Sequence, residues 1–147
     1  MACDAQSQTQ PVGRTDASSP AHCRCNSGYA HRPFAEYGTA AALPDNVCHA
    51  CPQGHHNAAV GANTCTACSA GTALFATAST SVAACGECGA HTFSAADSAN
   101  CTACGTFSRS PAGSDQETDC VCNAGYTGTP GGTCNTCAAG KFKFSDG

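Results

Sequence analysis

The sequence is poor in the residues that build a hydrophobic core. It contains no Ile and no Trp, and it has two Leu, five Val and six Phe in 147 residues. Ala and Cys supply most of its 41% hydrophobic content. Burial stabilises by roughly 25 cal/mol per Å², whereas ordering the backbone costs about 1–2 kcal/mol per residue, so side chains this small cannot offset that cost alone. The composition therefore excludes a large hydrophobic core and requires covalent or metal cross-links.

Charge and long apolar runs are also scarce. Six Lys and Arg stand against ten Asp and Glu, which gives a formal net charge of −4. Without a basic patch, binding to nucleic acid is not expected. Without an apolar run near roughly 18 residues, insertion of this segment into a membrane is not expected either. Residues 1–6 lack the apolar stretch of a secretory signal, so we expect any signal to lie upstream or to have been removed.

Cysteine is the residue that the sequence has in excess. Fifteen cysteines form about a tenth of the chain, a density typical of a disulfide scaffold or of a set of metal sites. The Cys-x-Cys pairs are Cys23/Cys25 and Cys120/Cys122, and the Cys-x-x-Cys pairs are Cys48/Cys51, Cys65/Cys68, Cys85/Cys88, Cys101/Cys104 and Cys134/Cys137. Each Cys-x-Cys is followed by a Gly-Tyr and later by a Cys-x-x-Cys. A short repeat is thus nested in a longer one.

A glycine and an aromatic residue accompany the cysteine that opens each module. The glycine lies one or three residues after that cysteine, at Gly28, Gly54, Gly71, Gly89, Gly105, Gly125 and Gly140. The aromatic residues that follow are Tyr29, Phe75, Phe93, Phe107, Tyr126 and Phe142, and one module has His55-His56 instead. Glycine permits a tight turn with positive φ. We therefore expect short hairpins in which an aromatic ring covers the adjacent disulfide, and helix at most near residues 40–43.

The spacing of the cysteines suggests a pairing. We suppose that the first cysteine of each close pair ends one loop and that the second opens the next. The predicted disulfides are then Cys3–Cys23, Cys25–Cys48, Cys51–Cys65, Cys68–Cys85, Cys88–Cys101, Cys104–Cys120 and Cys122–Cys134. Cys137 remains unpaired in this segment, so we expect the natural chain to continue past Gly147 to its mate. Spacing alone does not fix connectivity, and an interleaved first-to-third, second-to-fourth pairing stays open.

Zinc is the rival explanation of the cysteines. Two sets of four approximate a four-thiolate zinc site: Cys48, Cys51, Cys65 and Cys68, and Cys85, Cys88, Cys101 and Cys104. The Cys-x-Cys pairs fit such sites poorly, and the pattern runs on without boundaries between quartets. We therefore predict disulfides, no metal and no cofactor.

Two stretches carry a family resemblance. The run from Cys51-Pro52-Gln53-Gly54 to Cys68, and the next run to Cys88, resemble GCC-type cysteine-rich repeats of the ephrin-receptor-like and tumour-necrosis-factor-receptor-like kinds. The run Cys120–Tyr126, with Cys134, resembles the end of an EGF-like domain, in which the last two cysteines pair locally, and this resemblance supports Cys122–Cys134. Long arrays of this kind rich in Ala, Thr and Ser are similar to surface and flagellar-hair proteins of algae and other protists, which implies a structural or adhesive role and glycosylation.

These observations predict a small disulfide-rich fold: an elongated tandem array of short cysteine-rich modules with β-hairpins, little helix and no large hydrophobic core. The predicted parts are a polar loop at 1–22, an EGF-like module at 23–51, GCC-type repeats at 51–104, a second EGF-like module at 104–137, and the start of a further, truncated module at 137–147.

Candidate sites are few. Asn100-Cys101-Thr102 is a standard N-glycosylation sequon. Pro20, Pro111 and Pro130 each follow Ser or Thr and are candidates for hydroxyproline-linked sugars, or are plain turn prolines. His49, His55 and His56 are either metal ligands or exposed loop residues. The acidic residues are read as solvated turn positions, at Asp97, Asp115, Glu117 and Asp119.

The sequence offers no catalytic set, so an enzyme is not expected. The predicted function is an extracellular structural segment of a cell-surface fibre, coat or flagellar hair, glycosylated and assembling with copies of itself or with neighbouring repeats. The alternatives are a receptor or adhesin ectodomain that binds a specific ligand, and an intracellular zinc-binding module.

Overall fold

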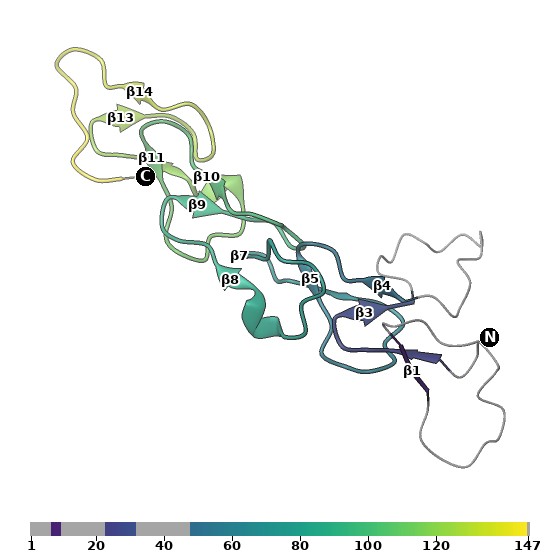
Figure 1. Ribbon diagram of the computed structural model, residues 1–147. Coiled ribbons are helices and arrows are strands. Elements are labelled where there is room, and N and C mark those ends of the chain that lie inside the picture. Colours follow the sequence, from purple (N-terminus) through teal and green to yellow (C-terminus); the bar gives the residue numbers. More distant parts are fainter. Residues whose placement is uncertain (1–6, 10–22, 32–47, 147) are drawn as a thin grey trace, which may run out of the picture. The chain divides into compact units, whose positions relative to one another are not determined.

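The structure is a computed structural model that describes residues 7–9, 23–31 and 48–146 (Figure 1). These residues contain short antiparallel strand pairs and no α-helix. The prediction of a small disulfide-rich fold with hairpins and little helix is confirmed. The stretch 40–43, where a helix was expected at most, lies outside the described residues.

The strands form seven two-stranded antiparallel ladders within the described ranges. The pairs are β1 (Ser7–Thr9) with β2 (Cys23–Cys25), β3 (Tyr29–Ala30) with β4 (His49–Ala50), β5 (His55–His56) with β6 (Thr66–Ala67), β7 (Thr72–Ala73) with β8 (Gly86–Glu87), β9 (Thr92–Phe93) with β10 (Thr102–Ala103), β11 (Ser108–Arg109) with β12 (Val121–Cys122), and β13 (Tyr126–Thr127) with β14 (Asn135–Thr136). Two short 3-10 turns are η3 (Val82–Ala84) and η4 (Glu117–Asp119).

The six ladders from β3–β4 to β13–β14 are each flanked by a disulfide. In one example, β7 pairs with β8 in the register Thr72↔Glu87 and Ala73↔Gly86. β7 follows Cys68 and β8 follows Cys85, and these two cysteines form a disulfide. An isolated two-stranded hairpin is marginally stable in water, and such a cross-link restricts the unfolded chain. The disulfide therefore explains how strands of two residues persist.

A left-handed residue follows each module-opening cysteine by three positions. Glycine fills this position five times, and His91 and Phe107 fill it in the other two modules, with φ of 68° and 62°. One residue later, the backbone N–H donates back across the turn, as from Thr72 N to Ser69 O at 3.1 Å. The expected tight turn is present, but Gly89 and Gly105 do not have positive φ. The conformation belongs to the third position and not to the glycine.

The described chain divides into two compact units. The first comprises Met1–Ala67 and Ala76–Ala84, and the second comprises Cys68–Phe75 and Cys85–Gly147. The strand pairs β1 to β6 belong to the first unit, and β7 to β14 belong to the second. The domain boundaries expected from the sequence stay predictions.

Cysteine forms most of the buried apolar interior of the described residues. Apart from Ala30 and Leu74, the apolar side chains that are buried all belong to cysteines. The expectation that an aromatic ring covers each disulfide is wrong for Phe75, Phe107 and Phe142, which are 69%, 48% and 74% exposed. These three rings lie outside the strands, and they follow the opening cysteine by seven, three and five residues. The rings therefore cannot all reach the same place.

Candidate functional site

The structure joins twelve of the described cysteines into six disulfides. The bonds are Cys25–Cys48, Cys51–Cys65, Cys68–Cys85, Cys88–Cys101, Cys104–Cys120 and Cys122–Cys134. These are the pairs that the boundary rule gives, and none of these six follows the interleaved alternative. The predicted pair Cys3–Cys23 involves Cys3, which lies outside the described residues. Cys137 is a half-buried free thiol.

Successive modules are joined by hydrogen bonds from the left-handed residue. In the second unit, Gly71 N donates to Ser94 O at 2.8 Å, and Gly71 O accepts from Cys88 N at 2.9 Å. His91 repeats this with Ser110 O and Cys104 N, both at 2.9 Å. The left-handed turn thus directs both backbone groups of one residue to the next module. We call this recurring contact the seam.

The same seam occurs in the first unit and at the C-terminal end of the second. Gly28 N donates to Asn57 O at 2.7 Å, and Gly28 O accepts from Cys51 N at 2.8 Å. Gly125 N donates to Lys143 O at 3.0 Å, and Gly125 O accepts from Cys137 N at 3.1 Å. The seam therefore recurs at four of the seven described left-handed positions: Gly28, Gly71, His91 and Gly125.

A polar side chain reinforces the seam from the sixth position after the opening cysteine. Ser94 Oγ donates to Thr72 O and Ser110 Oγ donates to Thr92 O, both at 2.9 Å. The equivalent donors in the other seams are Asn57 Nδ2 to Tyr29 O at 2.7 Å and Lys143 Nζ to Tyr126 O at 3.2 Å. Asn57, Ser94 and Ser110 are 5%, 2% and 5% exposed. Buried polar groups of this kind need a partner, and here each finds the carbonyl of the preceding module.

Sequence reasoning missed these four seam side chains. Their only signal is the constant offset from the cysteine, because Asn, Ser and Lys share no composition that marks them. Leu74 and Gly128 occupy the same offset in two other modules. A search for a repeated residue type could not find them, whereas a search for a repeated backbone position could.

The glycosylation candidates that the structure describes are accessible. Asn100 and Thr102 are exposed, and Cys101 between them is bonded to Cys88. Pro111 and Pro130 are also exposed, and Pro20 lies outside the described residues. Accessibility permits modification at Asn100, Pro111 and Pro130, and occupancy stays a prediction.

The three candidate histidines lie on strands. His49 is in β4, where its Nε2 is buried without a hydrogen-bond partner. His55 Nδ1 lies 3.1 Å from Gln53 O, and His56 is only 9% exposed. The reading of all three as exposed loop residues is wrong, since they occupy strands and His56 is buried. Among the described residues, their ring nitrogens do not gather into one metal-ligand group.

Both cysteine quartets proposed for zinc are occupied by disulfides in the structure. A separate group in the first unit brings ligand atoms of Cys25, His31 and Cys48 within 4.8 Å of one another. The two sulfurs of this group are bonded to each other. Since zinc binds thiolates, this oxidised pair does not offer the ligands that a zinc site needs.

Asp119 departs from the expectation for the acidic residues. Asp97, Asp115 and Glu117 are exposed, as expected of solvated turn positions. One carboxylate oxygen of Asp119 accepts from Asp115 N at 3.0 Å and from Gln116 N at 3.2 Å. Asp119 therefore fixes the turn that contains η4, because its side chain satisfies two backbone N–H groups.

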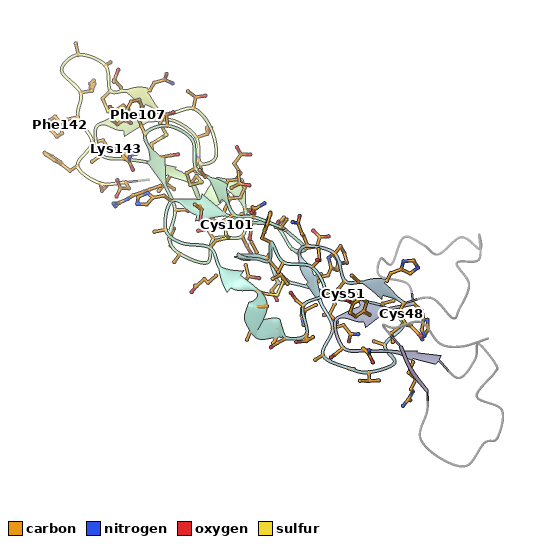
Figure 2. The ribbon with its side chains drawn as sticks, viewed as in Figure 1. Cys48, Cys51, Cys101, Phe107, Phe142 and Lys143 are labelled. Atoms are coloured by element: carbon orange, nitrogen blue, oxygen red, sulfur yellow. A yellow bond between two sulfur atoms is a disulfide. The ribbon has the colours of Figure 1, made fainter. Side chains whose placement is uncertain are left out.

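Exposed aromatic rings lie at the C-terminal end of the second unit. Phe107 and Tyr126 stack with ring centroids 4.2 Å apart. Phe142 and Phe144 form a tilted pair at 4.6 Å and are 74% and 87% exposed. Figure 2 shows Phe142 at the outer edge of the C-terminal segment. Rings this exposed can contact another molecule.

Comparison with known proteins identifies one segment. Residues 38–85, about a third of the chain, match the family described as tyrosine-protein kinase ephrin type A/B receptor-like. This segment is a cysteine-rich ephrin-receptor-like repeat, as the resemblance predicted. No curated protein matches the chain. The match and the disulfides fit an extracellular or secreted domain. No helix in the described ranges is long and apolar enough to cross a membrane.

Proposed function

We propose that the chain is a disulfide-stapled repeat segment of an extracellular structural protein, in a cell-surface fibre, coat or flagellar hair. The observation that carries this proposal is the seam, which joins one module to the next in the same way in both units. Modules that bond mainly to their neighbours can be added in tandem through the same contact, which is typical of a structural array. The partners are neighbouring repeats, further copies of the chain, and attached glycans.

The use of the buried polar side chains supports the proposal of a role without catalysis. In the described residues, Asn57, Ser94 and Ser110 each donate to a carbonyl of the preceding module. Side chains committed to backbone carbonyls in this way hold modules together and are not directed at a substrate. We therefore propose that the chain is not an enzyme.

A receptor or adhesin ectodomain is the second candidate. It is favoured by the match of residues 38–85 to the ephrin-receptor-like family, because that family is named after a receptor. In that case the repeats would hold a ligand-binding surface away from the membrane, and the seam would have the same mechanical role.

Assembly of the purified chain distinguishes the two candidates. The whole chain is produced in a secretory host and examined by electron microscopy and sedimentation over a range of concentrations. A structural protein is expected to form regular polymers, and a Phe142→Ser/Phe144→Ser variant is expected to form fewer, because these rings are exposed. A wild-type chain that stays monomeric at every concentration would argue for the receptor candidate.

A further inference from the structure

A cavity of about 350 Å³ lies in the second unit, beside the strand pair β11 and β12. His91, Arg109, Pro111, Val121 and Asp146 contribute to its lining. The volume falls within the range of small-ligand sites, which is roughly 300–1,000 Å³. The lining combines the apolar side chains of Pro111 and Val121 with the polar side chains of His91, Arg109 and Asp146.

His91 occupies a backbone position that does not suit it. Its φ is 68°, at the turn position where five other modules have glycine. A left-handed conformation costs an L-residue roughly 1–2 kcal/mol. Phe107, the other exception, gains a ring stacked on Tyr126. Within the described part of the chain, the His91 ring has neither a hydrogen bond nor a ring contact that would compensate. Strain that persists at one residue is a reason to look for a function there.

Arg109 already holds a carboxylate at this cavity. Its guanidinium forms an ion pair with Asp146, and the Arg109 side chain remains 52% exposed. The other carboxylate oxygen of Asp146 accepts from Ala124 N at 3.0 Å. The guanidinium fork matches the geometry of a carboxylate and can bind it through two hydrogen bonds. Asp146 is thus an internal occupant of a position that an external carboxylate can take.

We propose that this cavity binds a sugar acid. The uronate carboxylate replaces Asp146 on Arg109, the His91 imidazole bonds a ring hydroxyl, and the C–H face of the sugar lies on Pro111 and Val121. An imidazole can donate or accept such a hydrogen bond. Asp146 competes with the ligand because it is tethered to the same chain and is present at a high effective concentration. This site is independent of the assembly proposed above, since its test measures binding of a soluble sugar.

The test is isothermal titration calorimetry of the whole oxidised chain with galacturonate and glucuronate, with galactose and glucose as uncharged controls. Saturable binding of the acids alone is expected. Arg109→Gln is expected to weaken binding roughly tenfold or more, which is the size expected for a lost charged hydrogen bond. Lys141→Gln removes the same charge at an exposed position outside the cavity and is expected to change nothing. Asp146→Asn is expected to tighten binding several-fold, because the competitor is weakened.

His91→Gly separates the role in binding from a role in folding. Glycine relieves the positive φ, so the variant is expected to melt at a higher temperature than the wild type while binding the sugar acid several-fold more weakly. Far-UV circular dichroism checks that each variant is folded. The proposal is overturned if neither the wild type nor Asp146→Asn binds, if neutral sugars bind equally well, or if Arg109→Gln and His91→Gly bind like the wild type.

Discussion

Gly71 and Gly125 occupy the same turn position with nearly the same backbone, at φ of 80° and 83°, yet their surroundings differ. A Cβ on Gly71 would overlap the carbonyl of Gly113 in a neighbouring module, whereas a Cβ on Gly125 would meet nothing within 4 Å. Gly125→Ala is therefore expected to cost about 1 kcal/mol from the left-handed backbone alone. Gly71→Ala is expected to cost roughly 1–3 kcal/mol more, because the Gly113 backbone must move away from the new Cβ.

Denaturant unfolding of the oxidised chain measures this difference. Gly89→Ala is the matched control, because Gly89 lacks positive φ and has open space around it, and it is expected to change stability by less than about 0.5 kcal/mol. Equal destabilisation by Gly71→Ala and Gly125→Ala would show that the contact with Gly113 does not limit the turn.

A further prediction for a single residue is N-glycosylation of Asn100. Because Asn100 and Thr102 are exposed, secretion from a eukaryotic host is expected to add an N-glycan at this sequon. Intact mass should fall by one glycan in Asn100→Gln and in Thr102→Ala, and it should stay high in Thr102→Ser, which keeps the sequon. Identical masses for the wild type and Asn100→Gln would contradict the expectation.

The positions of the turns could be predicted from the sequence, but not in every module the residue with positive φ. Glycine spacing located the turn after each of the seven described opening cysteines, because glycine often marks a left-handed position. It misplaced the left-handed residue by two positions in two modules, where His91 and Phe107 have the positive φ. A residue type indicates only a preference, whereas the third position makes the contact with the next module: His91 N donates to Ser110 O, and Phe107 O accepts from Asn123 N.

At the scale of strands and modules, the seam rests on buried side chains such as Ser94. Its Oγ donates to Thr72 O, and its backbone carbonyl accepts from Gly71 N. Ser94→Ala is therefore expected to destabilise the second unit by about 1 kcal/mol and to speed hydrogen exchange at Gly71 N–H. Ser98→Ala is the matched control, because Ser98 Oγ donates to Ala95 O within its own loop, in a solvent-exposed hydrogen bond.

Hydrogen exchange followed by NMR reads each amide separately. Faster exchange at Gly71 in Ser94→Ala, with no change in Ser98→Ala, is the expected pattern. Equal exchange in both variants would mean that the serine side chain contributes nothing to the contact between modules.

Strand positions were largely predictable, and the contacts between modules were not. The hairpins follow from the cysteine spacing, since a disulfide such as Cys68–Cys85 brings the starts of both strands together. The seam depends on the sixth position, where Ser94 and Leu74 carry different chemistry. The rings of Phe75, Phe107 and Phe142 were misplaced because they lie outside the strands, at different distances from the opening cysteine.

For the whole molecule, we expect reduction of the disulfides to unfold the chain, because cysteines form most of the buried apolar interior. Nearly all buried apolar side chains in the described residues belong to disulfides. Each cross-link contributes about 3 kcal/mol on the entropic account. A typical domain is stable by only 5–15 kcal/mol, so the loss of several disulfides exceeds the stability available. The reduced chain is therefore expected to lose its exchange-protected amides and to be cleaved rapidly by protease, whereas the oxidised chain resists.

The number of free thiols before and after reduction can be counted from the intact mass of the alkylated chain. Under native conditions without reductant, Cys137 is expected to react, because it is the free thiol among the described cysteines. After reduction, every cysteine in the chain should react. If all cysteines reacted before reduction and zinc accompanied the protein, the disulfide scaffold would be wrong. If protection survived full reduction, the stability would have to come from the seam hydrogen bonds, because Ala30 and Leu74 bury too little apolar surface to supply it.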